Sequence, residues 1–225
     1  MLDILLTVGL AVFVPAYELW SSLRRKPAAK APPRRLRTYL GAIVRAALLM
    51  SALAAIWIPA DRSWNELGLA LPLAGKVGLG LAAILLISAA LYLAFAKPSK
   101  GATPPEVAGM MPSSRKELAG FLGMILVIGP SWEILFRGYL LWSLTPWLGT
   151  WPAVAVASLA YGAAHGYRNR GQFIGSLVAA LAFTTGYALT GSLWWLILVH
   201  TGLPILAVAG MARHRAAAAV ASQPA

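Results

Sequence analysis

The stretch Trp-Glu-Ile-Leu-Phe-Arg-Gly at 132–138 places a carboxylate and a guanidinium inside an otherwise apolar run. The flanks 121–128 and 139–144 are almost wholly hydrophobic. We therefore expect Glu133 and Arg137 to lie at membrane depth, where an unpaired charge costs several kcal/mol. Their spacing of four puts both side chains on one helical face, with the acid first, which is the favourable order for an ion pair. The stretch predicts either a self-neutralising pair or the polar face of a buried site.

The composition is that of a membrane protein. Of 225 residues, 59% are hydrophobic and only 12% are charged, which favours an all-α, polytopic membrane helical bundle over a soluble domain. The net charge of +12 comes from basic residues between the apolar segments, so we expect anionic lipid headgroups as partners and no nucleic acid. The absence of cysteine excludes disulfides and thiolate chemistry.

The apolar runs predict about seven transmembrane helices in a single integral-membrane domain, 1–211, followed by a disordered cytoplasmic tail, 212–225. The first run is interpreted as a retained helix, because it lacks the basic flank and cleavage site of a signal peptide. Gly129-Pro130 is expected to kink or split the fourth helix. The predicted spans are 4–20, 39–58, 77–96, 118–144, 153–165, 173–189 and 193–211.

The orientation follows from the distribution of lysine and arginine. Fifteen of the 19 basic residues fall in the segments on one side of the predicted spans, namely 22–38, 97–116, 166–171 and the part after 211. The other side has two, Arg62 and Lys76, and cytoplasmic segments carry the excess of positive charge. This asymmetry predicts an N-terminus outside and a C-terminus in the cytoplasm.

Two of the three histidines, His165 and His200, fall in predicted spans, whereas His214 falls in the tail. Intramembrane ionisable residues are functional candidates by default, so we expect these two imidazoles to share a site with Glu133 and Arg137. A buried glutamate could act as a general base toward water, helped by histidine. Alternatively, Glu133, His165 and His200 could bind a zinc ion with an open position for water. The sequence does not choose between no cofactor and Zn²⁺.

Three segments carry a family resemblance. Glu-Ile-Leu-Phe-Arg-Gly at 133–138, Tyr-Gly-Ala-Ala-His at 161–165 and then His200 resemble, in order, the motifs of the CPBP family of CAAX proteases and bacteriocin-processing intramembrane proteases. The resemblance covers about 115–208. It implies glutamate- or metal-dependent hydrolysis of a peptide bond in a membrane protein or peptide, prenylated substrates included. It also implies location in the plasma membrane of a prokaryote.

The resemblance assigns the catalytic site to Glu133, Arg137, His165 and His200, but two positions depart from the family pattern. Trp132 stands where the family has the first glutamate of a pair, and an indole cannot accept a proton from water. Pro204 stands where the family has a polar residue, four positions after His200. These departures leave open a catalytically degenerate member that acts in bacteriocin self-immunity or binds a membrane peptide. A proton-coupled transporter is a third hypothesis, which the lack of an internal repeat disfavours.

Depth raises a further question, because Glu133 is far along the fourth predicted helix, whereas His165 is near the cytoplasmic end of the fifth. A straight fourth helix would separate them, so we expect a break at Gly129-Pro130 to bring them level.

Overall fold

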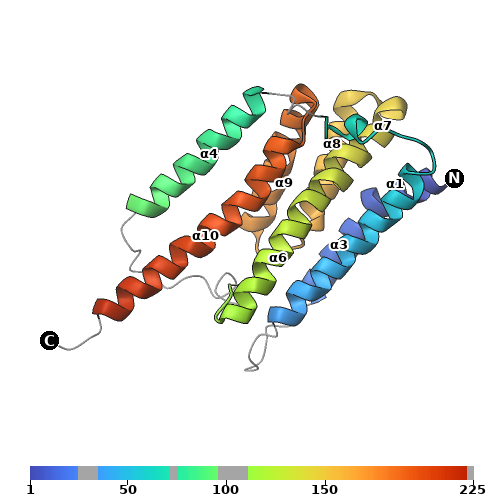
Figure 1. The fold of residues 1–225 in the computed structure, drawn as a ribbon. Helices are drawn as coiled ribbons and strands as arrows, with labels where there is room; N and C mark the ends of the chain where they lie inside the picture. Colours follow the sequence, from blue (N-terminus) through green and yellow to red (C-terminus); the bar gives the residue numbers. More distant parts are fainter. Residues whose placement is uncertain (25–34, 71–75, 96–110, 222–225) are drawn as a thin grey trace.

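All secondary structure in the described part of the chain is helical, which confirms the predicted all-α membrane bundle (Figure 1). The structure is a computed structural model that describes residues 1–24, 35–70, 76–95 and 111–221. The elements are α1 (Leu2–Val8), the π-helix η1 (Gly9–Phe13), α2 (Val14–Arg24), α3 (Arg35–Trp57), the 3-10 helix η2 (Trp64–Leu67), α4 (Lys76–Phe95), α6 (Arg115–Trp132), the π-helix η3 (Glu133–Tyr139), α7 (Leu140–Leu148), α8 (Thr150–Ala164), α9 (Arg170–Thr190) and α10 (Trp194–Ala221).

Within the described residues, five helical segments are long and apolar enough to cross a bilayer, so the chain is an integral membrane protein. Helix α4 contributes a shorter apolar stretch, Gly78–Tyr92. Helix α8 has 15 residues and extends about 22 Å, less than the roughly 30 Å of a hydrocarbon core. The five segments are Leu2–Arg24, Arg35–Trp57, Arg115–Leu148, Arg170–Thr190 and Trp194–Arg213.

The helices lie side by side, with α3, α6 and α10 adjacent in Figure 1 and α4 on the outer side of α10. Helix α8 packs closely on α9 because Gly162 has no side chain at their contact. A Cβ atom on Gly162 would lie 2.6 Å from Cδ2 of Leu177. Small residues such as glycine let the backbones of neighbouring membrane helices approach closely.

The fourth predicted helix does not split at Gly129-Pro130, so the expected break is absent, whereas the expected kink stays a prediction. Instead α6, η3 and α7 form one helical run of 34 residues, Arg115–Leu148, which continues through Pro130. The irregularity follows Pro130 as the π-helix Glu133–Tyr139. Single π-helical turns inside α-helices are frequent at functional sites.

A helical hairpin, rather than a break, brings Glu133 and His165 to the same depth. Gly149, at a φ of 79°, reverses the chain between α7 and α8. Glu133 lies 15 residues before Leu148, and His165 lies 15 residues after Thr150. Both are therefore about 22 Å from the turn at 1.5 Å per residue. The sequence-based expectation was wrong because the depth of Glu133 was counted from the start of its helix. The turn at Gly149 determines which residues share a depth.

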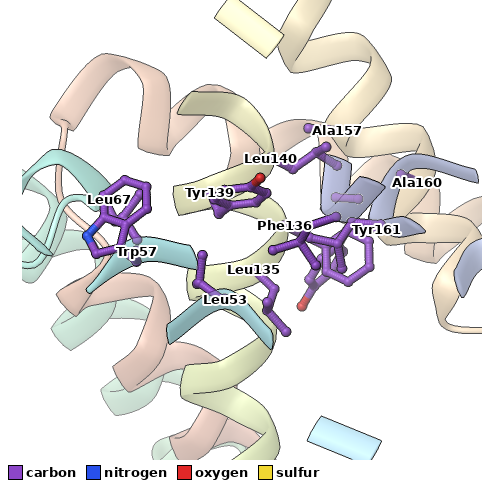
Figure 2. Close-up of a cluster of buried hydrophobic side chains, with 13 residues drawn as sticks. Leu53, Trp57, Leu67, Leu135, Phe136, Tyr139, Leu140, Ala157, Ala160 and Tyr161 are labelled. Atoms are coloured by element: carbon purple, nitrogen blue, oxygen red, sulfur yellow. The ribbon is translucent and has the colours of Figure 1, made fainter. Parts of the chain in front are cut away.

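The largest buried cluster surrounds η3 (Figure 2). Leu135 and Phe136 project from η3 into this cluster, and both are fully buried. Phe136 meets Tyr161 of α8 edge to face, with ring centroids 5.6 Å apart. On the other side, Trp57 of α3 meets Tyr139 at 6.3 Å. The element that carries Glu133 and Arg137 is thus held by aromatic contacts on two sides.

The C-terminal end also differs from expectation. Helix α10 continues to Ala221, so residues 212–221 are helical where a disordered tail was predicted. Alanine has the highest helix propensity, which lets the helix propagate through this alanine-rich segment. Residues 222–225 and most of the two basic segments 22–38 and 97–116 lie outside the described residues, and the orientation stays a prediction.

Candidate active site

The predicted ion pair between Glu133 and Arg137 forms inside the bundle. Nη1 of Arg137 donates to both carboxylate oxygens of Glu133. The two side chains are 2% and 1% exposed, so the pair is almost completely removed from solvent and lipid. The guanidinium also lies over the ring of Tyr161, 4.0 Å from its centroid. Because Glu133 is paired with a permanent cation, it is ionised and can only accept hydrogen bonds.

His200 reaches this pair from α10. Its Nδ1 atom lies 2.8 Å from Oε1 of Glu133. The hydroxyl of Tyr161 lies 3.0 Å from the same Nδ1 and 3.3 Å from Oε1 of Glu133. Since the carboxylate only accepts, Nδ1 of His200 carries the proton and its Nε2 holds the lone pair in the neutral ring. The close approach of α10 depends on Gly129, where a Cβ atom would lie 2.6 Å from Cγ2 of Thr201.

His165 joins the same group at the end of α8. Its Nδ1 lies 2.9 Å from the carbonyl oxygen of Tyr161, one turn earlier. A carbonyl oxygen also only accepts, so Nδ1 is again the protonated nitrogen and Nε2 is the basic one. The ring stacks against His200 with centroids 6.5 Å apart and an interplanar angle of 25°. Unlike Glu133, His165 is exposed.

The four predicted site residues line one cavity of about 300 Å³ between α8, α9 and α10. Thus Glu133, Arg137, His165 and His200 converge, as expected from the sequence. The rest of the wall is mostly apolar, including Ala179, Ala180, Phe183, Leu196, Val199 and Leu203. The arrangement combines two imidazoles and a shielded carboxylate at one end of an apolar pocket.

The residues do not fit a three-ligand zinc site as they are placed. Among the described residues, no group of three histidine, cysteine, aspartate or glutamate side chains is arranged to hold a metal ion. Both oxygens of Glu133 are bound by Arg137, and Oε1 is also bound by His200. The nitrogen that His200 turns toward Glu133 is a donor and therefore not a ligand atom.

The two departures from the family pattern occupy different places. Pro204 lies on the wall of the main cavity, one turn after His200. Trp132 does not line that cavity but packs on Phe136, with ring centroids 4.8 Å apart. Together with Tyr161, Ala164 and His165 it lines a separate void of about 40 Å³. Position 132 therefore faces His165 from the side opposite the main cavity.

Tyr161 is the site residue that the sequence analysis missed. From the sequence it was identified only as the first residue of the motif at 161–165, yet its hydroxyl contacts both Glu133 and His200. Its position four residues before His165, on the same face of α8, was an available signal. Ser176 and Phe183 of α9 also line the cavity, and nothing in the sequence connected them to the motifs.

Fold and site together define a helical integral membrane protein with a shielded carboxylate–imidazole centre. Residues 114–206 match the family model described as Type II CAAX prenyl endopeptidase Rce1-like, and this part of the chain is an Rce1-like domain of the CAAX protease (CPBP) family. The match confirms the resemblance and nearly the same bounds, 115–208. No curated protein and no solved structure matches the chain.

Proposed function

We propose that the protein is an intramembrane endopeptidase that hydrolyses a peptide bond of a membrane-associated protein or peptide. The observation that carries this proposal is the pair of imidazoles. In each ring Nδ1 donates a hydrogen bond within the protein, to the carbonyl oxygen of Tyr161 from His165 and to Glu133 from His200. Nε2 is then the basic nitrogen of each ring, and both rings line the same cavity. The Rce1-like domain supports peptide-bond cleavage as the reaction, with prenylated proteins as one substrate class.

Within this proposal His200 is the general base and Glu133 is a positioning residue. Glu133 holds the protonated Nδ1 of His200, so Nε2 is directed away from the carboxylate and can take a proton from water. The resulting imidazolium is stabilised by the adjacent carboxylate, as in other acid–histidine pairs. Arg137 keeps Glu133 ionised and fixed in place.

The chemical steps balance without a cofactor. Water gives a proton to Nε2 of His200 while its oxygen attacks the carbonyl carbon of the substrate. The tetrahedral intermediate then collapses, the carbon–nitrogen bond breaks, and the imidazolium returns its proton to the leaving amine. His165, on the same cavity, accepts a hydrogen bond from the water through its own Nε2 and orients the attack.

The cavity suits a substrate that reaches the site from the membrane. Its apolar wall, with small residues at Ala179 and Ala180, has room for an apolar side chain beside the imidazoles. Burying such a side chain contributes about 1.5–3 kcal/mol, which offsets part of the cost of ordering the peptide.

Purified protein in lipid nanodiscs tests the proposal against a panel of membrane-peptide substrates, some prenylated. We expect cleavage by the parent and its loss in His165→Ala, His200→Ala and Glu133→Gln. Glu117→Gln, a carboxylate change in the first turn of the same helical run and away from the main cavity, is the matched control and should cleave at the parental rate. Peptide binding without cleavage by the parent, with cleavage gained in Trp132→Glu, would instead identify a relative that has lost its base.

A further inference from the structure

A second cavity opens on the other side of the site, between α2 and α3. It has a volume of about 470 Å³, and its floor is formed by Ile128 and Trp132 of α6 and by Ala164 of α8. Glu18 of α2 and Arg45 of α3 face each other in it, with 3.3 Å between Oε1 and Nη1. We call this cavity the α2–α3 groove.

The groove and the main cavity are linked through residues that they share with the small void. Trp132 and Ala164 line both the groove and the void. Tyr161 and His165 line both the void and the main cavity. The three spaces therefore adjoin one another, with Trp132 and Ala164 where the groove meets the void and Tyr161 and His165 where the void meets the main cavity.

The charges in the groove indicate that it holds water. Glu18 and Arg45 lie within the two N-terminal candidate spans, and charged side chains inside spans almost always face a bundle interior or a water-filled cavity. The ion pair with Glu18 leaves the charge of Arg45 partly accessible, because the Arg45 side chain is 51% exposed. The lining of the groove is otherwise mostly apolar, so Glu18 and Arg45 are the side chains that would bind water there.

The void next to His165 is large enough for a water molecule. A site needs about 10–15 Å³ of probe-occupied volume to hold one water, and the void has about 40 Å³. Two of its four lining residues, His165 and Tyr161, have polar side chains. The main cavity is less suited to supply water during the reaction, because a bound peptide would fill its apolar space.

We propose that the α2–α3 groove is a separate water inlet, and that the void between Trp132 and His165 is a binding site for the water consumed in hydrolysis. Peptide enters the main cavity, water arrives from the opposite side, and Trp132 separates the two routes. Trp132 is then a positioning residue with a role of its own and not merely a lost acid. This inference rests on the proposed function for the use of the water, but the hydration of the groove does not.

The absence of cysteine allows a direct test with single-cysteine reporters. Ala164→Cys places a thiol in the groove, and Val44→Cys, on the exposed face of α3 and not among the groove residues, is the lipid-facing control. A small, charged methanethiosulfonate reagent labels thiolates in contact with water. Because a charge in hydrocarbon costs several kcal/mol, we expect Ala164→Cys to be labelled at least about tenfold faster than Val44→Cys.

Two matched filling variants decide the route. Ala42→Trp fills the groove, and Ala179→Trp fills the main cavity; both replace an alanine that lines a cavity. Ala42→Trp should slow labelling of the Ala164→Cys reporter about tenfold, by the same desolvation argument, and Ala179→Trp should leave it unchanged. Ala42→Leu repeats the test with a smaller side chain if the tryptophan variant does not fold.

Labelling of Ala164→Cys no faster than Val44→Cys would overturn the inlet, as would slowing by Ala179→Trp and not by Ala42→Trp. In the cleavage assay, the account expects Ala42→Trp to lower kcat and Ala179→Trp to raise KM. The expected labelling pattern in a protein that cleaves no substrate would support the hydrated groove and contradict the proposed function, so the two failures are distinguishable.

Discussion

Nδ1 of His200 lies 2.8 Å from Oε1 of Glu133, although 67 residues separate them in the sequence. The contact joins α10 to the π-helix η3 and depends on the close approach of the backbones at Gly129. It fixes the tautomer of His200 and supplies a counter-charge for the imidazolium form. The proposed chemistry follows from this relationship more than from either residue alone.

Removing one member of the Glu133–Arg137 pair should destabilise the protein strongly. Glu133→Ala leaves the buried guanidinium uncompensated, which costs about 3–5 kcal/mol for a pair of this burial. The double variant Glu133→Leu/Arg137→Met removes both charges and should recover most of that loss. Thermal unfolding in detergent gives the comparison, and a double variant less stable than Glu133→Ala would contradict the buried-pair account.

His165→Ala should separate activity from stability. The side chain is exposed and makes one hydrogen bond, to the carbonyl of Tyr161, so its loss should cost no more than about 1 kcal/mol. Its proposed contact with the attacking water predicts a fall in kcat of about 10²–10⁴. Parallel melting and cleavage curves test this. A large drop in melting temperature with the parental activity retained would assign His165 a structural role.

Tyr161→Phe should have a small effect. The hydroxyl is a third donor to a carboxylate that Arg137 and His200 already bind, whereas the ring packs against Phe136 and under the guanidinium of Arg137. Phenylalanine keeps the ring contacts and loses the hydroxyl that contacts Glu133 and His200. Because a hydrogen bond contributes about 0.5–1.5 kcal/mol, kcat should fall about tenfold. Tyr161→Ala, which also removes the ring, is the comparison and should be markedly less stable. Equal losses in both variants would contradict this division of roles.

A second polar cluster should stabilise the contact between α1 and the segment that follows α3. Arg62 binds both carboxylate oxygens of Asp3, at 2.6 and 2.9 Å, and its guanidinium lies 4.8 Å from the centroid of Trp142. The hydrogen bond to Asp3 raises the pKa of Arg62 above its ordinary value. Arg62→Ala should lower stability by about 1–2 kcal/mol, discounted for the partial exposure of the pair, without changing kcat.

Arg62→Lys is the control for that cluster. Lysine keeps the charge but cannot reproduce the two-pronged geometry, so it should recover only part of the loss in the same thermal unfolding measurement. Full recovery by lysine would mean that charge alone, and not the planar guanidinium, holds the cluster together.

The local part of the site could be predicted from the sequence because it depends on spacing along one helix. The separation of four between Glu133 and Arg137 indicated their ion pair. Both histidines were indicated because ionisable side chains are costly to place at membrane depth. The contacts between helices were not accessible in this way. The role of the Tyr161 hydroxyl depends on how α8 faces η3 and α10, which no spacing within α8 reveals.

The position of the helix irregularity was also beyond the sequence. Pro130 predicted an irregularity at its own position, whereas the π-helix begins three residues later and spans Glu133–Tyr139. The aromatic packing around Phe136 and Tyr139 holds that segment in place, and this packing involves residues from distant parts of the chain (Figure 2). Similarly, the hairpin at Gly149 determines which residues of α6–α7 and α8 share a depth.

The most direct test of the central claim is a double-mutant cycle on peptide cleavage, with kcat/KM measured for the parent, Glu133→Gln, His200→Gln and the double variant. If the carboxylate acts through the imidazole, each single change should lower kcat/KM by at least about a hundredfold, and the double variant should lose no more than the worse single variant. Losses that multiply in the double variant, or a parental rate in either single variant, would show that Glu133 and His200 do not act as one catalytic unit.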